Sequence, residues 1–212
     1  YVKEYFDIQM NSGAYEAKGV FGVIAPWNFP LAIPVGMTTA ALVCGNCAIL
    51  KPAEQTPLIA MEFHRLALEA GRPADVFAIA LGEGDIGASI VDNEKIEGSV
   101  FTGSKEVGQK IYTKLKVNNC SGKTKTAITE MGGKNAIIVT NNCELDETVE
   151  GTVYAAFAHA GQKCSAASRV IIDEKIKAFG DYTKRGITLY SVNKKMPKRI
   201  PPLRHFRLII KN

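Results

Sequence analysis

One cysteine of this 212-residue chain stands in a setting that suits nucleophilic chemistry. Cys164 follows Gly161-Gln162-Lys163, just past a predicted helix, and small residues come after it. A thiol attacks as its thiolate, and neighbouring basic residues such as Lys163 and Arg169 favour that form. A buried structural cysteine is the alternative. Cys164 is therefore a candidate nucleophile, and other motifs of the chain must decide between the two interpretations.

Glu130 offers a carboxylate that could serve such chemistry. It lies at the end of a predicted strand, directly before Met131-Gly132-Gly133-Lys134. Because the two glycines give the backbone freedom, a carboxylate at this position suits a mobile general base. An ordinary surface acid is the alternative. A Cys-His hydrolase is disfavoured, because none of the three histidines (His64, His159 and His205) pairs with a cysteine or serine motif.

Two turns that contain glycine could bind a phosphate group. Residues 82–87 read Gly-Glu-Gly-Asp-Ile-Gly after a predicted strand, which matches a dinucleotide-binding pattern. This pattern needs an acidic residue about 20 positions later, after the next strand, but the sequence offers Lys105-Glu106 there, already inside the next predicted helix, so a tight loop is favoured. Thr102-Gly103-Ser104 forms the second turn, where Ser104 could cap a helix whose free N–H groups attract an anion. By itself, this second turn could be any helix cap.

Short apolar runs alternate with helical stretches, and these elements must position the candidate side chains. Strands are predicted at 20–25, 48–51, 76–81, 96–101, 127–130, 136–139 and 170–172. Helices are predicted from the Thr56-Pro57 cap to Gly71, after Ser104, and along the apolar stripe from Val149 to Ala160. This alternation predicts an α/β fold with a parallel sheet.

Composition and charge exclude several classes of protein. The chain is 46% hydrophobic and 22% charged, which is typical of a globular protein. Its net charge of +5 is uneven, because residues 1–180 have a net charge of −3 and residues 181–212 have one of +8. A basic surface over the whole body is excluded, so no nucleic-acid partner is expected. A basic tail that binds nucleic acid or an acidic partner is a minor alternative.

The cysteines and the apolar segments bear on the compartment. Five cysteines in a chain of this length do not suggest a disulfide framework. Cys44 and Cys47 form a C-x-x-C pair, but a second pair at ligand spacing is missing, so no metal site is expected. Residues 19–50 carry no charge, yet three prolines interrupt them, so no membrane helix is expected. Reduced thiols and the lack of a visible signal peptide favour the cytoplasm.

Five short motifs follow one another along the chain. They are Pro26-Trp27-Asn28-Phe29-Pro30, Lys51-Pro52-Ala53-Glu54-Gln55-Thr56-Pro57, Phe101-Thr102-Gly103-Ser104, Glu130-Met131-Gly132-Gly133-Lys134-Asn135 and Gly161-Gln162-Lys163-Cys164. In these residues and in this order the chain resembles the aldehyde dehydrogenase superfamily, over about residues 18–177. Two stretches, 28–37 and 161–169, look most like the 1-pyrroline-5-carboxylate (L-glutamate γ-semialdehyde) dehydrogenase branch.

The resemblance implies an enzyme that uses NAD to oxidise a small-molecule aldehyde to a carboxylate. The expected reaction is the conversion of L-glutamate γ-semialdehyde to L-glutamate in proline degradation. Cys164 would attack the aldehyde and form a thiohemiacetal, whose oxyanion the Asn28 side chain and the Cys164 N–H would stabilise. Hydride transfer to the nicotinamide would leave a thioester, and water activated by Glu130 would hydrolyse it.

The resemblance also implies where NAD would bind. Lys51 and Glu54 are placed at the adenosine ribose, and Trp27 also belongs to the cofactor-binding set. A carboxylate accepts hydrogen bonds from a 2′-hydroxyl and repels a 2′-phosphate, so Glu54 favours NAD over NADP. Gly103 and Ser104 would approach the pyrophosphate. The family binds its dinucleotide in an atypical Rossmann-like manner, so the glycine pattern at 82–87 need not be the phosphate loop.

The implied fold is a Rossmann-like parallel sheet of the aldehyde dehydrogenase type, incomplete, with the start of the catalytic domain. Residues 1–130 would form part of the NAD-binding domain, 131–177 the start of the catalytic domain with Cys164, and 178–212 a basic tail that does not resemble the family. Family members are more than twice as long, so an internal fragment of a homo-oligomeric enzyme is expected. The alternatives are an inactive fragment that retains at most nucleotide binding, and an aldehyde dehydrogenase of another substrate specificity.

Overall fold

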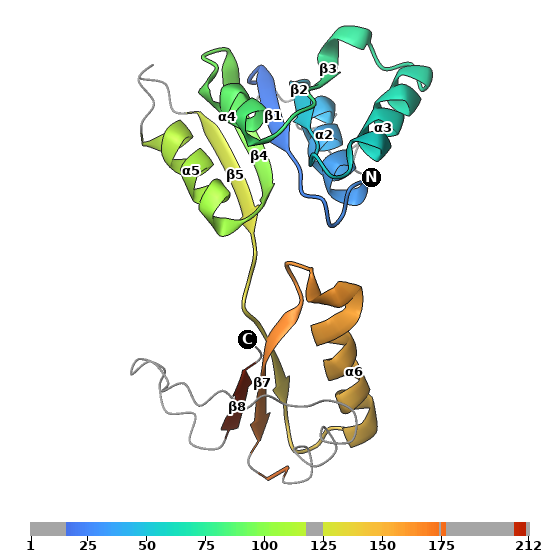
Figure 1. Ribbon diagram of the computed structural model, residues 1–212, viewed down its shortest axis with the longest axis vertical. Coiled ribbons are helices and arrows are strands. Elements are labelled where there is room, and N and C mark those ends of the chain that lie inside the picture. Colours follow the sequence, from blue (N-terminus) through green and yellow to red (C-terminus); the bar gives the residue numbers. More distant parts are fainter. Residues whose placement is uncertain (1–15, 118–124, 174, 177–205, 211–212) are drawn as a thin grey trace. The chain divides into compact units, whose positions relative to one another are not determined.

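A computed structural model describes residues 16–117, 125–173 and 175–176, together with the backbone of a strand at 206–210. The chain divides into two compact units, Tyr1–Met131 and Gly132–Asn212, and each is described by itself (Figure 1). No helix among the described residues is long and apolar enough to cross a membrane.

The first unit is built on a five-stranded sheet. Its strands are β1 (Val20–Ile24), β2 (Cys47–Lys51), β3 (Phe77–Ile79), β4 (Ile96–Gly103) and β5 (Thr126–Met131). They lie in the order β3-β2-β1-β4-β5, and every neighbouring pair is parallel. The predicted parallel α/β fold is therefore confirmed. The strand order reverses between β1 and β4, and open α/β sheets bind ligands outside the carboxyl ends of the strands at such a point.

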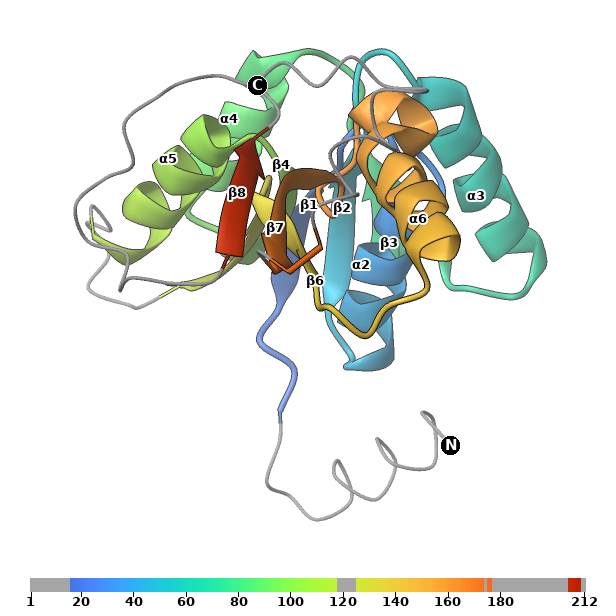
Figure 2. The same cartoon turned by 90° about the horizontal axis from the view of Figure 1, so that it is seen from below.

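Helices cover both faces of this sheet. They are α2 (Ala32–Val43), α3 (Pro57–Glu69), α4 (Gly84–Asp92) and α5 (Lys105–Lys116), with a short 3₁₀ turn η1 (Ala74–Val76) before β3. Figure 2 shows α2 and α3 on one side of the strands and α4 and α5 on the other. Val23 is buried in the core beneath the first pair, whereas its neighbour Ile24 packs against the core beneath the second pair. Strands buried on both faces tend to be apolar, and β1 and β3 consist wholly of apolar residues.

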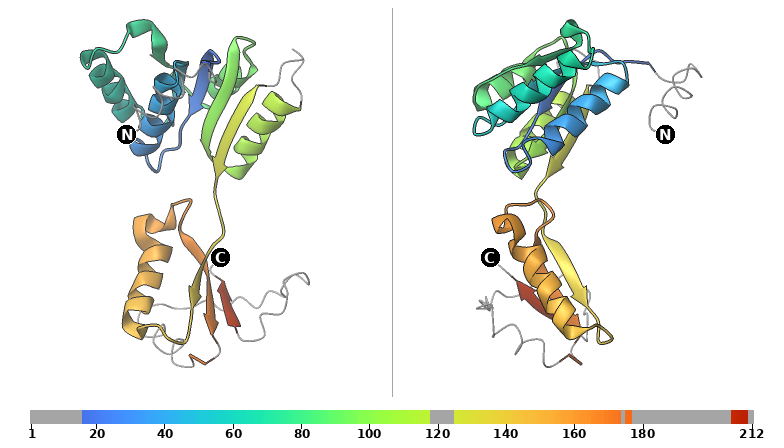
Figure 3. Two further views of the ribbon diagram at one scale, coloured as in Figure 1. Left: turned by 180° about the vertical axis from the view of Figure 1, so that it is seen from behind. Right: turned by 90° about the vertical axis from the view of Figure 1, so that its right-hand side faces the viewer.

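The second unit holds a smaller sheet and one longer helix. Its elements are β6 (Asn135–Val139), α6 (Leu145–Phe157), the 3₁₀ turn η2 (Ala158–Gly161), β7 (Ala167–Asp173) and β8 (Phe206–Ile210). β7 lies in the middle, parallel to β6 and antiparallel to β8 (Figure 3). Buried Val139 and Ile172 form its core with residues of α6 such as Val149. No strand was predicted at β8, because residues 181–212 show no regular apolar period.

Three local features differ from the sequence prediction. α2 was not predicted, and its Pro34 lies in the first helical turn, where a backbone N–H needs no partner within the helix. α4 begins at Gly84, so the predicted tight loop at 82–87 is partly helical. β4 continues to Gly103, because Thr102 and Gly103 pair with Glu130 and Met131 of β5. The second turn is therefore shorter than predicted.

Candidate active site

Seven predicted site residues lie at one edge of the first unit's sheet. They follow or end β1, β2, β4 and β5: Trp27, Asn28, Lys51, Glu54, Gly103, Ser104 and Glu130. The carboxyl ends of parallel strands share an edge, so the topology brings these residues to the side where the strand order reverses. Cys164 belongs to the second unit and is described there.

Trp27 and Asn28 lie in the connection from β1 to α2. The N–H of Ala25 donates to the carbonyl of Lys51 at 3.1 Å, which extends the pairing of β1 with β2 by one residue. Beyond that point the chain turns toward α2, whose first turn is stabilised by a hydrogen bond from the Val35 N–H to the Leu31 carbonyl at 3.0 Å. Trp27 is 45% exposed and Asn28 is half-buried. The loop thus places an indole and a side-chain amide at the edge of the sheet.

Lys51 and Glu54 form an ion pair at the end of β2. The Lys51 side chain is buried, and its Nζ lies 3.0 Å from Oε2 of Glu54, which is 48% exposed. Gln55 Nε2 donates to the other carboxylate oxygen, Oε1, at 2.9 Å. Two hydrogen bonds hold the pKa of the Glu54 carboxyl below its ordinary value of 4.5. The larger effect comes from the backbone at Glu54 and the smaller one from the Lys51 side chain. Glu54 is therefore a carboxylate at neutral pH.

Gly103 and Ser104 form the junction of β4 and α5. Ser104 Oγ accepts from the Val107 N–H at 3.3 Å, so the predicted helix cap is confirmed. A Cβ at Gly103 would lie 2.6 Å from Cζ of Phe101, which leaves no room for a side chain. Helix α5 therefore follows a position without a side chain, and the free N–H groups at the start of a helix attract a phosphate.

The start of α3 at Thr56 differs from the start of α5 at Ser104. The helix begins at Pro57, as predicted, with Thr56 at the N-cap position. The Thr56 hydroxyl makes no capping hydrogen bond, and its buried Oγ1 has no partner among the described residues. Proline at the first helical position needs no N–H acceptor, so this helix starts without a side-chain cap.

Glu130 lies in β5 beside the end of β4. It pairs in register with Thr102, and its side chain is exposed. The hydroxyl of Thr102 in turn donates to Sδ of Met37 in α2 at 3.4 Å, which ties the end of β4 to the helix that follows Asn28. A carboxylate at this accessible edge has the exposure that a general base for water requires.

Cys164 occupies a β-turn between η2 and β7. The Ala166 N–H donates to the Lys163 carbonyl at 3.1 Å and closes the turn, and the Cys164 thiol is free and exposed. Three consecutive residues before it have a left-handed backbone: His159 (φ 56°), Ala160 (φ 55°) and Gly161 (φ 69°). For a residue other than glycine this conformation costs ~1–2 kcal/mol, and such strain is found at functional sites.

One residue near Cys164 was given no role by the sequence. Asn135 is the last residue of the fourth motif, and its side chain contacts the backbone of the Cys164 turn. The two residues are 29 positions apart, so no local period or spacing could reveal the contact.

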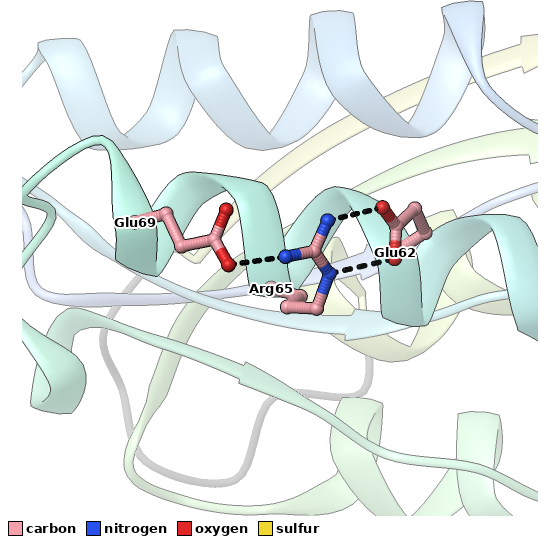
Figure 4. Close-up of polar contacts among 3 residues, drawn as sticks. All are labelled: Glu62, Arg65 and Glu69. Atoms are coloured by element: carbon pink, nitrogen blue, oxygen red, sulfur yellow. Dashed lines mark hydrogen bonds and ion pairs between the residues drawn. The ribbon is translucent and has the colours of Figure 1, made fainter.

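The outer face of α3 carries a separate group of charges. Arg65 binds Glu62 through two hydrogen bonds, of 2.6 and 2.8 Å, and also contacts Glu69 (Figure 4). The hydrogen bond from Arg65 lowers the pKa of Glu62. All three side chains are about half exposed, and exposed ion pairs contribute little to stability. This group therefore has the character of an ordinary helix surface.

Comparison with known proteins identifies the family. The sequence profile of the aldehyde dehydrogenase family matches residues 6–193. The chain belongs to the aldehyde dehydrogenase family. The resemblance found in the five motifs is thereby confirmed, and the matched range is wider at both ends than the predicted 18–177.

Individual relatives support the branch of the family. A 1-pyrroline-5-carboxylate dehydrogenase of Bacillus thuringiensis (strain Al Hakam) is 44% identical over 171 residues, which are 80% of this chain and 33% of that protein. Proline utilization A (PutA) from Bdellovibrio bacteriovorus has a TM-score of 0.74 and 47% identity over 79% of this chain and 18% of its own. A Thermus 1-pyrroline-5-carboxylate dehydrogenase with bound NAD has a TM-score of 0.76 and 38% identity, covering 80% of this chain and 33% of its own. The chain thus spans about a third of the length of the curated relatives it matches.

Proposed function

We propose that this chain carries the NAD-binding sheet and the nucleophile of an enzyme that oxidises L-glutamate γ-semialdehyde to L-glutamate. The observation that carries the proposal is the exposed free thiol of Cys164, held on a closed turn in a chain of the aldehyde dehydrogenase family. The choice of aldehyde is supported by the 44% identity to proteins named 1-pyrroline-5-carboxylate dehydrogenase.

The first unit fits a dinucleotide. Its strand order is that of a doubly wound nucleotide-binding sheet, and α5 begins at the point where the order reverses. Glu54 is ionised and accessible at the end of β2, where a carboxylate accepts hydrogen bonds from a ribose and disfavours a 2′-phosphate. Gly103 and Ser104 would hold the pyrophosphate, Lys51 and Glu54 the ribose, and Trp27 would complete the site. These residues favour NAD over NADP.

The residues of the chain divide the chemistry among them. The Cys164 Sγ forms a bond to the aldehyde carbon after the thiol gives up its proton to solvent, and the Asn28 amide and the Cys164 N–H donate to the resulting oxyanion. Bound NAD supplies the acceptor for the hydride that must leave this carbon. Glu130 then takes a proton from water while the water oxygen bonds to the thioester carbon. The C–S bond breaks, the Cys164 thiolate is restored and a carboxylate is released.

Replacing the thiol tests this proposal. Cys164→Ser should lower the rate of NADH formation from L-glutamate γ-semialdehyde by at least about 10³-fold, because the nucleophile is lost. Cys143→Ser is the matched control, since Cys143 is a free, half-buried thiol of the same unit and should leave the rate within about twofold. Undiminished turnover by Cys164→Ser contradicts the role of the thiol. Nucleotide binding by the wild-type chain without any turnover supports the alternative of an inactive nucleotide-binding fragment.

The substrate needs its own comparison. Values of kcat/KM for L-glutamate γ-semialdehyde, a shorter aldehyde acid and an uncharged aldehyde of similar size should rank in that order. An uncharged aldehyde in first place contradicts the proposed substrate. The homo-oligomeric state and the cytoplasmic location expected from the sequence stay predictions.

A further inference from the structure

We propose that Asn135 is a positioning residue for Cys164, because its side-chain amide holds the turn that carries the thiol. The inference rests on the proposed role of Cys164 as nucleophile. It concerns contacts within the second unit only, and Asn135 itself lies at the start of β6.

The amide of Asn135 binds two carbonyls of the turn. Its Nδ2 donates to the Cys164 carbonyl at 2.7 Å and to the Ala166 carbonyl at 3.3 Å. An amide –NH₂ group has two hydrogens, so it can serve both carbonyls at once. The Ala166 N–H is already bound to the Lys163 carbonyl. The turn is therefore closed from within by one hydrogen bond and held from outside by two more.

A shift in the pairing of β6 with β7 accompanies this contact. Asn135 pairs with Ala167, but the next residue, Ala136, pairs with Arg169. Ser168 is thus an extra residue, and its hydroxyl lies 3.5 Å from the Asn135 carbonyl. Bulges of this kind change the direction of neighbouring side chains and occur often beside active sites.

Gly133 gives the amide the room it needs. A Cβ at this position would lie 3.2 Å from Nδ2 of Asn135 and 3.4 Å from the Cys164 carbonyl oxygen. The guanidinium of Arg169 also donates to the Lys134 carbonyl, which ties the segment before β6 to β7. The segment from Gly133 to Asn135 is thus fitted closely against the turn.

Such a contact matters for a nucleophile because attack needs a defined geometry. A displacement of about 1 Å from that geometry can lower a rate by about 10²-fold. The left-handed residues His159, Ala160 and Gly161 lead into the turn, and a strained backbone keeps its form only where surrounding contacts fix it. Asn135 supplies such contacts at the carbonyls of Cys164 and Ala166.

Asn135→Asp is the most direct test, measured in the full chain by NADH formation from L-glutamate γ-semialdehyde. It keeps the shape of the side chain but replaces the –NH₂ group, which carries both N–H donors, by one oxygen that faces two carbonyl oxygens. The kcat should fall about 10- to 100-fold, while KM for the aldehyde and for NAD stays within about twofold. Gly133→Ala should also lower kcat, because its Cβ would crowd the amide.

Thr140→Val is the matched control. Thr140 follows the other end of β6, and its hydroxyl donates to Oδ1 of Asn142 at 2.6 Å. Removal of this side-chain hydrogen bond should leave kcat unchanged. If Asn135→Asp lowers only the melting temperature and leaves kcat as in the wild type, the residue is merely structural and the inference is wrong.

A second measurement separates this inference from the proposed function. If the wild-type chain forms no NADH, the proposed function fails, and deuterium uptake by residues 162–168 then decides about the contact. Asn135→Asp should speed exchange there about tenfold and leave α6 unchanged. Equal uptake in the two proteins overturns the inference even if the wild type is an active dehydrogenase.

Discussion

Replacement of Glu54 by glutamine should weaken the discrimination of the proposed cofactor site against NADP. The carboxylate is ionised at neutral pH, because the backbone at Glu54 and Lys51 hold its pKa below 4.5. Glutamine keeps the shape of the side chain and one oxygen that can accept from a ribose hydroxyl. It removes the negative charge that would repel a 2′-phosphate.

The size of the effect follows from Coulomb's law. Glu54 is 48% exposed, so a dielectric constant near that of water applies. Two unit charges about 5 Å apart then interact by ~0.8 kcal/mol. A phosphate monoester carries about 1.5 to 2 negative charges, which makes the repulsion ~1.2–1.7 kcal/mol. Because Lys51 is present in both proteins, its attraction for the phosphate cancels. The ratio of the two dissociation constants should therefore change about tenfold.

Titration calorimetry with NAD and with NADP measures this ratio for the wild type and for Glu54→Gln. Glu62→Gln is the matched control, since Glu62 also has a lowered pKa but lies on the outer face of α3 (Figure 4). The control should keep the wild-type ratio. A ratio for Glu54→Gln within twofold of the wild type refutes the assignment of Glu54 to the ribose, as does an equal change in the control.

Two further predictions concern stability. Gly82→Ala should lower the free energy of unfolding in urea by about 1–3 kcal/mol, because φ is +144° and the new Cβ would lie 2.4 Å from Cγ1 of Ile86. Gly84→Ala is the control, since its Cβ would meet nothing within 4 Å and the free energy of unfolding should not change. Equal losses in the two variants contradict this prediction. Because the pKa of Glu54 is lowered on folding, its contribution to stability is complete above pH 4.5 and is lost as the pH falls through the lowered value. Melting temperatures from pH 7 to pH 3 should therefore fall less for Glu54→Gln than for the wild type, and parallel curves are the contrary result.

The strands β1 and β2 could be predicted because each is a short, mainly apolar run with residues buried on both faces of the sheet. Val23 and Leu50 are fully buried, and short apolar runs bounded by glycine or proline favour strands. The start of α5 could also be predicted from a local signal, because serine is a favoured N-cap residue and the Ser104 hydroxyl accepts from the Val107 N–H. These features depend on neighbours within a few positions.

The elements that escaped prediction lack such local signals. α2 carries no charged residue, so no polar face marks its period, and its Pro34 suggested an interruption although the first turn tolerates it. α4 starts inside a glycine pattern that favours a loop, and its packing against β1, β4 and α5 stabilises the helix. In both helices tertiary burial outweighs intrinsic preference.

The candidate site divides in the same way. The side chains that follow strands were assigned roles from the family motifs that contain them, and the parallel topology of the sheet brings those strand ends together. The contact between Asn135 and Cys164 could not be predicted, because it depends on a one-residue shift between β6 and β7 and on the missing side chain of Gly133. A substitution at Gly133 or Asn135 would therefore disturb the surroundings of the thiol without removing any group to which the proposed chemistry assigns a role. The motif Glu130-Met131-Gly132-Gly133-Lys134-Asn135 therefore combines two proposed functional parts: a carboxylate near the end of β5 in the first unit, and an amide that holds the turn of the proposed nucleophile Cys164 in the second unit.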